Sequence, residues 1–467
     1  MATSFLAGVN ASPSIRPQFN IGSLFDQQTG SYEYGKHGEA ILNGGLAHIT
    51  GICGRGNSFK TVIMLYMFLT VLDRYLSSGM VYDTEISLTV KRLQGLSKKM
   101  INHLLGVNFM PSDKFVLTDK SKYNGTEWFE WLKEVTEFRQ KMHKADMAIT
   151  PFIDSVSKHI EMLIPFMVGV DSLSEFTTAS VIKQQNGGSI GESDMNTIAL
   201  RDANAKTQLI RELATLCENN GVYFLTTMHM GDQHQLDPYA PPAKKLAFMK
   251  GKITLKNVPE KASFLLNNIW HVMGSAVLQN PKTKLVEFPR DSKDDLKGDT
   301  DLMVLSVTNL RGKAGTSGFP FDLVVSQKEG LEVELTDMYY LLNYGRFGLG
   351  GNDKSYFLEL YPDLLLSRST VRGKLKKDPL AARALEITSR LLQMINYRCD
   401  DAEDIMCTPK ELRDDLIAMG YDWNVLLATR TWWTFNNDKH PVPYLETLDL
   451  LRMRAGLYVP YWYKKAG

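Results

Sequence analysis

The amino-acid sequence predicts an α/β fold, with a mainly parallel central sheet flanked by helices and a mostly helical C-terminal domain. A glycine-containing turn at residues 54–61 stands between an apolar run and a long apolar helical pattern. Short apolar strands at residues 80–85, 166–171 and 222–229 end in polar side chains and alternate with helical patterns. This alternation is typical of a parallel sheet covered by helices. Beyond residue 330, helical patterns broken by Gly and Pro replace the strands.

The chain has 467 residues, enough for a large core and two to three domains. Residues 1–30 are rich in Ser, Pro, Asn and Gln, and we expect residues 1–43 to form an N-terminal arm that is flexible or orders against a neighbour. Residues 44–335 are expected to form the α/β core. Residues 336–467 are expected to form the helical domain.

The composition restricts the class of protein. Lys and Arg number 53 against 52 Asp and Glu, so the net charge of +1 allows a nucleic-acid site only as a local patch. Four cysteines without paired C-x-x-C spacing argue against a disulfide framework and against a structural zinc site. No secretory pattern opens the chain, and no run of about 18 apolar residues occurs. We therefore expect a cytoplasmic protein that does not cross a membrane.

The turn at residues 54–61 has the sequence order of a phosphate cradle. Backbone N–H groups of such a turn, and of the helix that follows, attract an anion. Lys60 supplies a cation for the outer phosphates, and the Thr61 hydroxyl is a ligand for Mg²⁺. The predicted ligand is a nucleoside triphosphate bound by Gly54, Arg55, Gly56, Asn57, Ser58, Phe59, Lys60 and Thr61. Phe59 stands where the motif has its second glycine, so a chance glycine-rich turn is the alternative interpretation.

Two further strand ends carry acids. The strand at residues 80–85 ends in Asp83 and Glu85, and the strand at residues 166–171 ends in Asp171. Ligands of parallel sheets bind at the carboxyl ends of the strands. We expect Glu85 or Asp83 to activate water and Asp171 to help hold Mg²⁺. Capping of the following helix is the alternative role for the first pair.

Clustered cations follow the strand at residues 222–229. The segment at residues 230–263 contains Tyr239 and Phe248 among its lysines, and such a mixture suits single-stranded nucleic acid. A solvated surface loop is the alternative. The lysines are Lys244, Lys245, Lys250, Lys252, Lys256 and Lys261. Arg311 and Lys313 fall in a predicted turn between two antiparallel strands, from which they would reach the γ-phosphate of a neighbouring subunit.

Four segments, taken in order, resemble the RecA-type recombinases, and most closely the phage UvsX branch. They read GRGNSFKT, YDTEISL, VGVDSLSEF and LTTMHMGD. The most specific detail is Phe59 immediately before Lys60, because UvsX-like proteins are similar at this position. The resemblance extends over about residues 44–325.

The resemblance implies a RecA-like P-loop ATPase core that uses ATP and Mg²⁺. It implies that Glu85 polarises the attacking water, that Asp171 is the Walker B acid and that His229 senses the γ-phosphate. The glycine-rich segment containing Gln184, Asn186 and Gly187, and the lysine-rich segment after His229, resemble two mobile DNA-binding loops. Arg311 and Lys313 resemble cations offered across a filament interface. Arg92 stands where relatives carry an aromatic residue over the adenine.

The expected activity is that of an ATP-dependent DNA recombinase. It would form helical filaments on single-stranded DNA and exchange strands with homologous duplex DNA, in the host cytoplasm if a phage encodes it. Single-strand-binding and mediator proteins are the expected helpers. Two alternatives stay open, namely a RecA-fold ring helicase or translocase and a non-catalytic recombination mediator.

Overall fold

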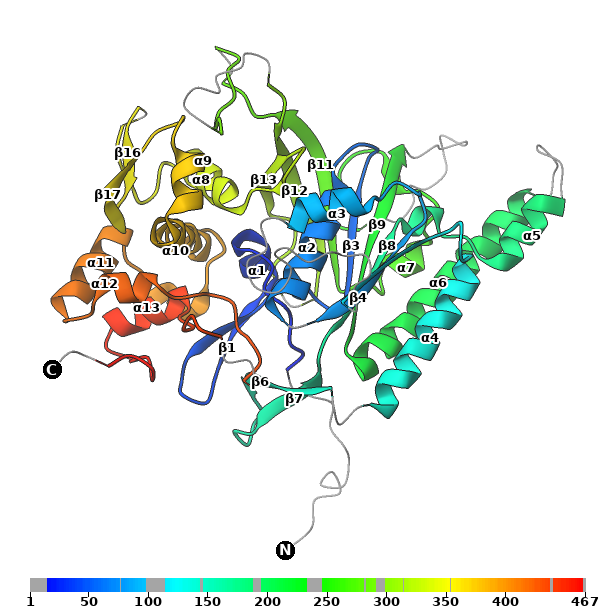
Figure 1. Ribbon diagram of the computed structural model, residues 1–467, viewed down its shortest axis with the longest axis horizontal. Helices are drawn as coiled ribbons and strands as arrows, with labels where there is room; N and C mark the ends of the chain where they lie inside the picture. The colour runs from blue at the N-terminus through cyan, green and yellow to red at the C-terminus, as the bar shows by residue number, and fades with distance from the viewer. Residues whose placement is uncertain are drawn as a thin grey trace, which may run out of the picture.

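A computed structural model gives the architecture (Figure 1). The structure describes residues 15–75, 77–97, 114–142, 146–187, 195–232, 246–280, 283–290, 299–313, 315–352, 354–436 and 440–464. None of the helices in these ranges combines the length and the apolar character that crossing a lipid bilayer requires.

A large central sheet organises the molecule and confirms the predicted α/β class with a mostly parallel sheet. The strands lie in the order β14-β13-β12-β11-β3-β9-β8-β4-β5, and β10 pairs with β9. The neighbours from β11 to β5 run parallel, whereas β11 to β14 pair antiparallel, as predicted for the last pair. The strands are β3 (Ile49–Gly54), β4 (Ser78–Asp83), β5 (Phe115–Asp119), β8 (Phe166–Asp171), β9 (Val222–Asp232), β10 (Ile253–Leu255), β11 (Asn268–Val277), β12 (Leu302–Gly312), β13 (Pro320–Ser326) and β14 (Gly330–Leu331).

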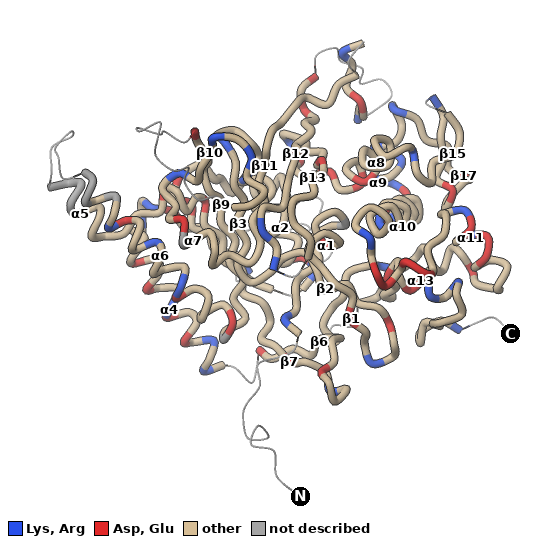
Figure 2. The backbone as a smooth tube through the Cα atoms, turned by 180° about the vertical axis from the view of Figure 1, so that it is seen from behind, with Lys and Arg blue, Asp and Glu red and all other residues tan. Residues whose placement is uncertain are grey.

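Helices cover both faces of this sheet. On one face, α2 (Lys60–Arg74) is buried over most of its length, as its continuous apolar sequence predicts. On the other face, α4 (Gly125–Lys141) and α6 (Met195–Asn220) lie side by side, and both helices contain acidic and basic residues (Figures 1 and 2). Helix α4 begins at a capping box in which Asn124 and Glu127 bond each other's backbone N–H groups. Shorter helices are α3 (Val90–Ser97), α5 (Ala179–Gly187), α7 (Glu260–Ser263) and the 3₁₀ turn η2 (Leu173–Glu175).

Two predicted irregular segments are partly regular. Residues 184–187, expected in a loop, form the last turn of α5, whose Val, Ile, Lys and Gln residues are compatible with a helix. Residues 230–263, expected to lack secondary structure, contain the end of β9, strand β10 and helix α7. The register aligns Ile253 with Asp232, so the chain folds back on itself as an antiparallel pair.

Residues 15–43 pack into the core instead of extending as an arm. Phe19 is fully buried, and its ring lies 4.5 Å from the rings of both Tyr75 and Tyr223. The segment forms α1 (Ser23–Thr29), β1 (Ser31–Tyr34) and β2 (Ala40–Asn43). The polar composition of this segment predicted an arm, but a few large apolar residues pack the segment into the core. Residues 1–14 of the expected arm lie outside the described residues.

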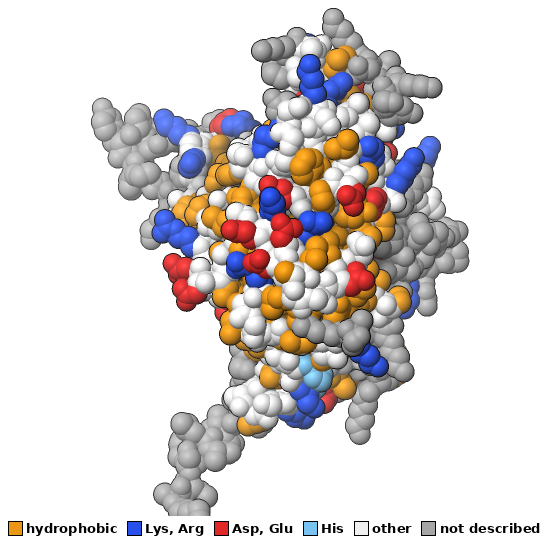
Figure 3. All heavy atoms as spheres, turned by 90° about the vertical axis from the view of Figure 1, so that its left-hand side faces the viewer, with side chains coloured by type: hydrophobic (Ala, Val, Ile, Leu, Met, Phe, Trp, Pro, Cys, Tyr) orange, Lys and Arg blue, Asp and Glu red, His pale blue; other side chains and the backbone are white. Residues whose placement is uncertain are grey.

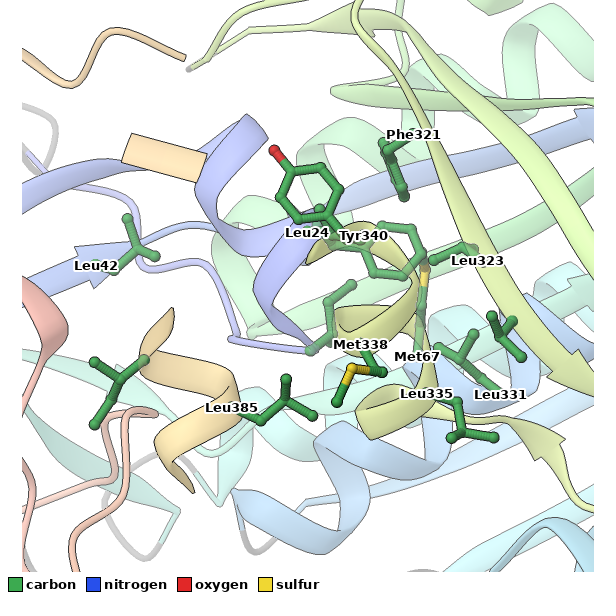
Figure 4. Packing of buried hydrophobic residues seen from close by; sticks show 14 of the residues in the cluster. Leu24, Leu42, Met67, Phe321, Leu323, Leu331, Leu335, Met338, Tyr340 and Leu385 are labelled. Carbon is green, nitrogen blue, oxygen red and sulfur yellow. The ribbon is translucent and has the colours of Figure 1, made fainter. Parts of the chain in front are cut away.

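The expected boundary near residue 335 falls inside α8 (Val333–Asn343), and the hydrophobic core continues across it. Side chains of α1, α2, β13, α8 and α10 (Pro379–Asn396) meet in one cluster (Figure 4). The C-terminal region is mostly helical, as predicted, with a small three-stranded sheet in addition. Its other elements are β15 (Leu349–Gly351), β16 (Tyr356–Leu358), β17 (Tyr361–Leu366), α9 (Val371–Lys377), η3 (Asp400–Ile405), α11 (Pro409–Ala418), α12 (Trp423–Leu427) and α13 (Thr447–Arg454).

The basic stretch at residues 368–383 is divided between the surface and the interior, since Lys376 and Lys377 are exposed and two of its arginines are buried. The side chains of Arg372 and Arg383 are only 3% and 5% exposed and pair with Glu332 and Glu386 at 2.7 and 2.8 Å. On the face formed by this end of the molecule, acidic and basic side chains are interspersed with apolar ones (Figure 3). The hairpin of β6 (Met147–Ile153) and β7 (His159–Leu163) lies near the N-terminal segment.

Candidate functional site

The carboxyl ends of four neighbouring parallel strands bring the predicted site residues together. The strand order is β3-β9-β8-β4, with Gly54 aligned with His229 and Asp83 aligned with Asp171. The residues that follow β3, β4 and β8 leave the sheet at this edge, and β9 continues past it to Asp232. The four segments that are far apart in the sequence therefore form one crevice, as expected for a parallel sheet.

The turn after β3 has the backbone shape of an anion cradle. Asn57 and Phe59 have positive φ angles of 56° and 61°, and the Ser58 hydroxyl donates a 2.7 Å hydrogen bond to the Arg55 carbonyl. Gly54 is required by close packing, since a Cβ there would lie 2.6 Å from Ser58 Oγ. Phe59 thus occupies, as the residue before the first turn of α2, a conformation that glycine favours.

Lys60 lies inside the turn. Its residue is 7% exposed, and its Nζ donates a 2.7 Å hydrogen bond to the Arg55 carbonyl. Burial lowers the pKa of Lys60, while the charges of Glu85 and Asp171 act in the opposite direction. The ammonium group is held where the backbone of the turn converges, the position from which it can contact a bound phosphate. Arg55 itself points outward and pairs with the exposed Asp232.

Thr61 and Asp171 lie in direct contact. The Thr61 hydroxyl donates a 2.7 Å hydrogen bond to Asp171 Oδ2, and the Thr227 hydroxyl donates to Oδ1. Burial raises the pKa of the Asp171 carboxyl, although both hydroxyls lower it. A hydroxyl and a carboxylate at the start of α2 are oxygen ligands of the type that Mg²⁺ prefers.

Glu85 and His229 form a pair across the crevice. Glu85 Oε1 lies 2.6 Å from His229 Nε2, and the two side chains are 30% and 27% exposed. Partial burial raises the pKa of Glu85, but hydrogen bonds from His229 and Ser172 and the charge of Lys60 together hold it below its usual range. Glu85 is therefore an ionised carboxylate that the site keeps accessible.

Asp83 has a different role from Glu85. Its buried carboxylate accepts hydrogen bonds from the backbone N–H groups of Glu85, Ser87 and Leu88 at 2.9, 2.6 and 2.7 Å. The alternative interpretation, that an acid at this strand end caps the following helix, does not describe Asp83, because the bonded N–H groups lie in the loop that precedes α3. Asp83 fixes the loop that carries Glu85.

Arg92 contacts the turn between β13 and β14. It belongs to α3, and its Nη1 donates a 2.7 Å hydrogen bond to the Gln327 carbonyl in the turn between β13 and β14. The Arg92 guanidinium is bound to that turn, and its contact with an adenine ring stays a prediction.

Arg311 and Lys313 lie away from the crevice of their own chain. Arg311 belongs to β12, not to a turn, and is aligned with Ile269 of β11, whereas Gly54 is aligned with Val272. Three residues along β11 correspond to about 10 Å toward the amino ends of the parallel strands. Arg311, Lys313 and the half-exposed Phe264 line an open hollow of about 510 Å³. Burial, followed by the nearby charges of Arg311 and Arg16, lowers the pKa of Lys313.

The candidate DNA-binding residues are described only in part. Lys250, Lys252 and Lys256 are exposed and flank β10, at the carboxyl edge of the sheet. Lys244 and Lys245 lie outside the described residues. The backbone of Gln184, Asn186 and Gly187 lies in α5.

Sequence reasoning missed Thr227 and Thr84. The Thr84 hydroxyl accepts a hydrogen bond from Ser172 N at 2.6 Å and donates to the Ser172 carbonyl at 2.9 Å, which joins the ends of β4 and β8. Both threonines stand at strand ends beside predicted site residues. That position is the one signal in the sequence that points to them.

The described residues fit a metal-bound nucleoside triphosphate. The turn holds a buried ammonium, and a hydroxyl lies beside a carboxylate at the start of α2. Within the described ranges, no three His, Cys, Asp or Glu side chains gather to hold a metal ion on their own.

No protein-family model matches the sequence, and a search of curated proteins finds no match. The functional inference therefore depends on the geometry of the crevice.

Proposed function

We propose that this protein is a DNA-dependent ATPase of the RecA type, a recombinase that polymerises on single-stranded DNA and promotes homologous pairing and strand exchange. The observation that supports this proposal best is the meeting of Lys60, Thr61, Asp171, Glu85 and His229 at adjacent strand ends. This combination contains a phosphate cation, a metal-ligand pair and an ionised carboxylate, the set that phosphoryl transfer to water requires.

When bound, Mg²⁺ would neutralise part of the charge on the triphosphate of ATP. Lys60 would exchange its hydrogen bond to the Arg55 carbonyl for contacts with the outer phosphates, and the backbone N–H groups of the turn would bind the phosphate oxygens. Thr61 and Asp171 would hold the metal ion, with Thr227 orienting the carboxylate. Glu85 would orient the attacking water and accept its proton, and His229 holds Glu85 in place at 2.6 Å.

The position of Arg311 and Lys313 favours action between subunits. In their own chain, Arg311 is aligned through Ile269 with Gly51, about 10 Å from the level of Gly54 and toward the amino ends of the parallel strands. In a head-to-tail polymer, the hollow that they line would face the triphosphate of a neighbouring copy. ATP bound between two subunits would stabilise the filament, and hydrolysis would remove contacts to the γ-phosphate and release DNA.

Electron microscopy of the protein with ATP and single-stranded DNA, together with a strand-exchange assay, tests the proposal. Open helical filaments and exchange of a homologous strand are expected. Closed rings that unwind DNA without exchange would indicate a helicase or translocase instead. Filaments without ATP turnover, in both the wild type and Glu85→Gln, would indicate a mediator.

A further inference from the structure

A buried lysine of α6 lies behind the crevice. The Lys206 side chain is 1% exposed, and its Nζ donates hydrogen bonds to the Asn257 carbonyl at 2.9 Å and to the Ser174 carbonyl at 3.2 Å. Asp202 Oδ2, one turn earlier on α6, lies 2.8 Å away. An ammonium group has three N–H donors, so these three oxygens use all of them.

The two carbonyls come from segments with different roles. Ser174 belongs to η2, the turn that directly follows Asp171. Asn257 follows β10, the strand flanked by the exposed Lys250, Lys252 and Lys256. Lys206 therefore joins the metal side of the crevice to the candidate DNA-binding segment through one charged group.

The connection continues to His229. The Ser174 hydroxyl accepts a 2.9 Å hydrogen bond from His229 N and donates a 2.9 Å hydrogen bond to the Lys256 carbonyl. Lys256 N in turn donates to the His229 carbonyl at 2.8 Å. Any displacement of residues 256–257 thus changes the hydrogen bonds that fix the backbone of His229, the partner of Glu85.

Packing alone does not explain a lysine at this position. Burying an ammonium group costs several kcal/mol unless its donors are satisfied, and an apolar side chain of similar length would fill the space without this cost. What the lysine adds is a strong, directional bond to each of two separate segments. That property suits a group which keeps two segments in a fixed relation.

We propose that Lys206 is a positioning residue that couples binding of single-stranded DNA at the β9–β10 segment to the Glu85–His229 pair. Phosphates that bind Lys250, Lys252 and Lys256 displace the turn at residues 256–257, and Lys206 and Ser174 transmit this displacement to His229. This inference rests on the proposed function, since it assumes an ATPase that responds to DNA.

The test compares two variants. Lys206→Met keeps the side-chain length and removes the charge, whereas Lys206→Arg keeps the positive charge. ATP turnover is measured with and without poly(dT), and poly(dT) binding is measured separately by fluorescence anisotropy. For Lys206→Met we expect stimulation by poly(dT) to fall to within about twofold of unity, while the affinity for poly(dT) changes less than about threefold. We expect Lys206→Arg to recover part of the stimulation. Lys133→Met, which removes an exposed lysine paired with Glu212, is the matched control and should keep the full stimulation.

Ser174→Ala provides a second variant that creates no buried unpaired charge, should Lys206→Met fail to fold. It removes the acceptor of His229 N and should also lose the stimulation. If wild-type turnover responds to poly(dT) and both folded variants respond equally, the coupling role is overturned and the proposed ATPase stands. If the wild type shows no response to DNA, both proposals fall.

Discussion

Glu85 and His229 are 144 residues apart in the sequence, yet Oε1 of the glutamate lies 2.6 Å from Nε2 of the histidine. The strands that carry them, β4 and β9, are separated in the sheet by β8. The pair therefore spans the strand end that carries Asp171. In the proposed function, a carboxylate fixed in this way near Asp171 and Lys60 acts as the base for water.

Replacing Glu85 by Gln should reduce ATP turnover by about 10²–10⁴-fold, because the amide cannot accept a proton from water. Binding of ATP should change little, since Lys60 and the turn are untouched. Steady-state turnover and binding of a fluorescent ATP analogue measure the two effects. Glu130→Gln, on the exposed surface of α4, is the control and should behave as wild type. Equal turnover in both variants would remove Glu85 from the mechanism.

Because the pKa of Asp171 is raised, we expect metal-dependent nucleotide binding to weaken as the pH is lowered. Burial raises the pKa of this carboxyl above its ordinary value, and the protonated form does not bind Mg²⁺. Glu85 has a lowered pKa and so stays ionised to lower pH than Asp171. Affinity for the Mg²⁺-bound ATP analogue should fall in the wild type as the pH is lowered into the acidic range. Asp171→Asn should bind weakly and without this pH dependence; a retained dependence would assign it to another group.

The positive φ of Phe59 predicts an unusual order of stability for two truncations. Phe59→Gly and Phe59→Ala both remove the partly buried ring, so their difference reports the backbone. At a φ of 61° we expect the glycine variant to be more stable by about 1 kcal/mol, the reverse of the usual order at a helix. Chemical unfolding measures the difference. Equal stability, or a more stable alanine variant, would contradict the left-handed conformation.

Asp26 predicts a pH-dependent contribution to stability. Burial raises its pKa to about 7, and the opposing charge of Arg390 lies 3.5 Å away. Between the pKa of an exposed Asp and about 7, the folded state binds more protons than the unfolded state, so this contribution to the free energy of unfolding falls as the pH rises.

Asp26→Asn should remove that pH dependence. The melting temperature of the variant relative to wild type should therefore rise between pH 5 and pH 8. Thermal unfolding followed by circular dichroism at several pH values gives this difference. Parallel curves for the two proteins would show that Asp26 does not titrate in this range.

Replacing Lys250, Lys252 and Lys256 by Ala should weaken binding to single-stranded DNA and reduce its salt dependence. For each lysine that pairs with a phosphate, its removal should lower the slope of log K against log salt by about 0.7. Anisotropy titrations at several salt concentrations measure the slope. The control replaces Lys133, Lys141 and Lys158, which lie on α4 and the β6–β7 hairpin, and should leave the slope unchanged. An unchanged slope in the first variant would support the alternative interpretation, in which the lysines around β10 lie on a solvated surface and do not bind DNA.

Local sequence patterns identify the four strands whose ends form the candidate site, the helix α2 and the polar residues at those strand ends. Apolar runs of strand length and a continuous apolar helix pattern act locally, so the elements at residues 49–54, 60–74, 166–171 and 222–232 are readable from the chain. Local patterns misled where composition was ambiguous. Residues 184–187 appeared to be loop but continue α5, and the polar segment at residues 15–43 contains the buried Phe19 and Asp26.

Only the tertiary structure decided which strand ends are neighbours and which charges are buried. The order β3-β9-β8-β4 places Lys60, Asp171, Glu85 and His229 in one crevice. Asp83 bonds the loop that carries Glu85, and Arg311 is displaced toward the amino ends of the parallel strands. The tertiary structure also buries the side chains of Arg372 and Lys206 among oxygen atoms from other segments of the chain. Periodicity arises from the backbone geometry of a few adjacent residues. Strand pairing and ion burial depend instead on the summed contacts of residues far apart in the chain, which no local pattern contains.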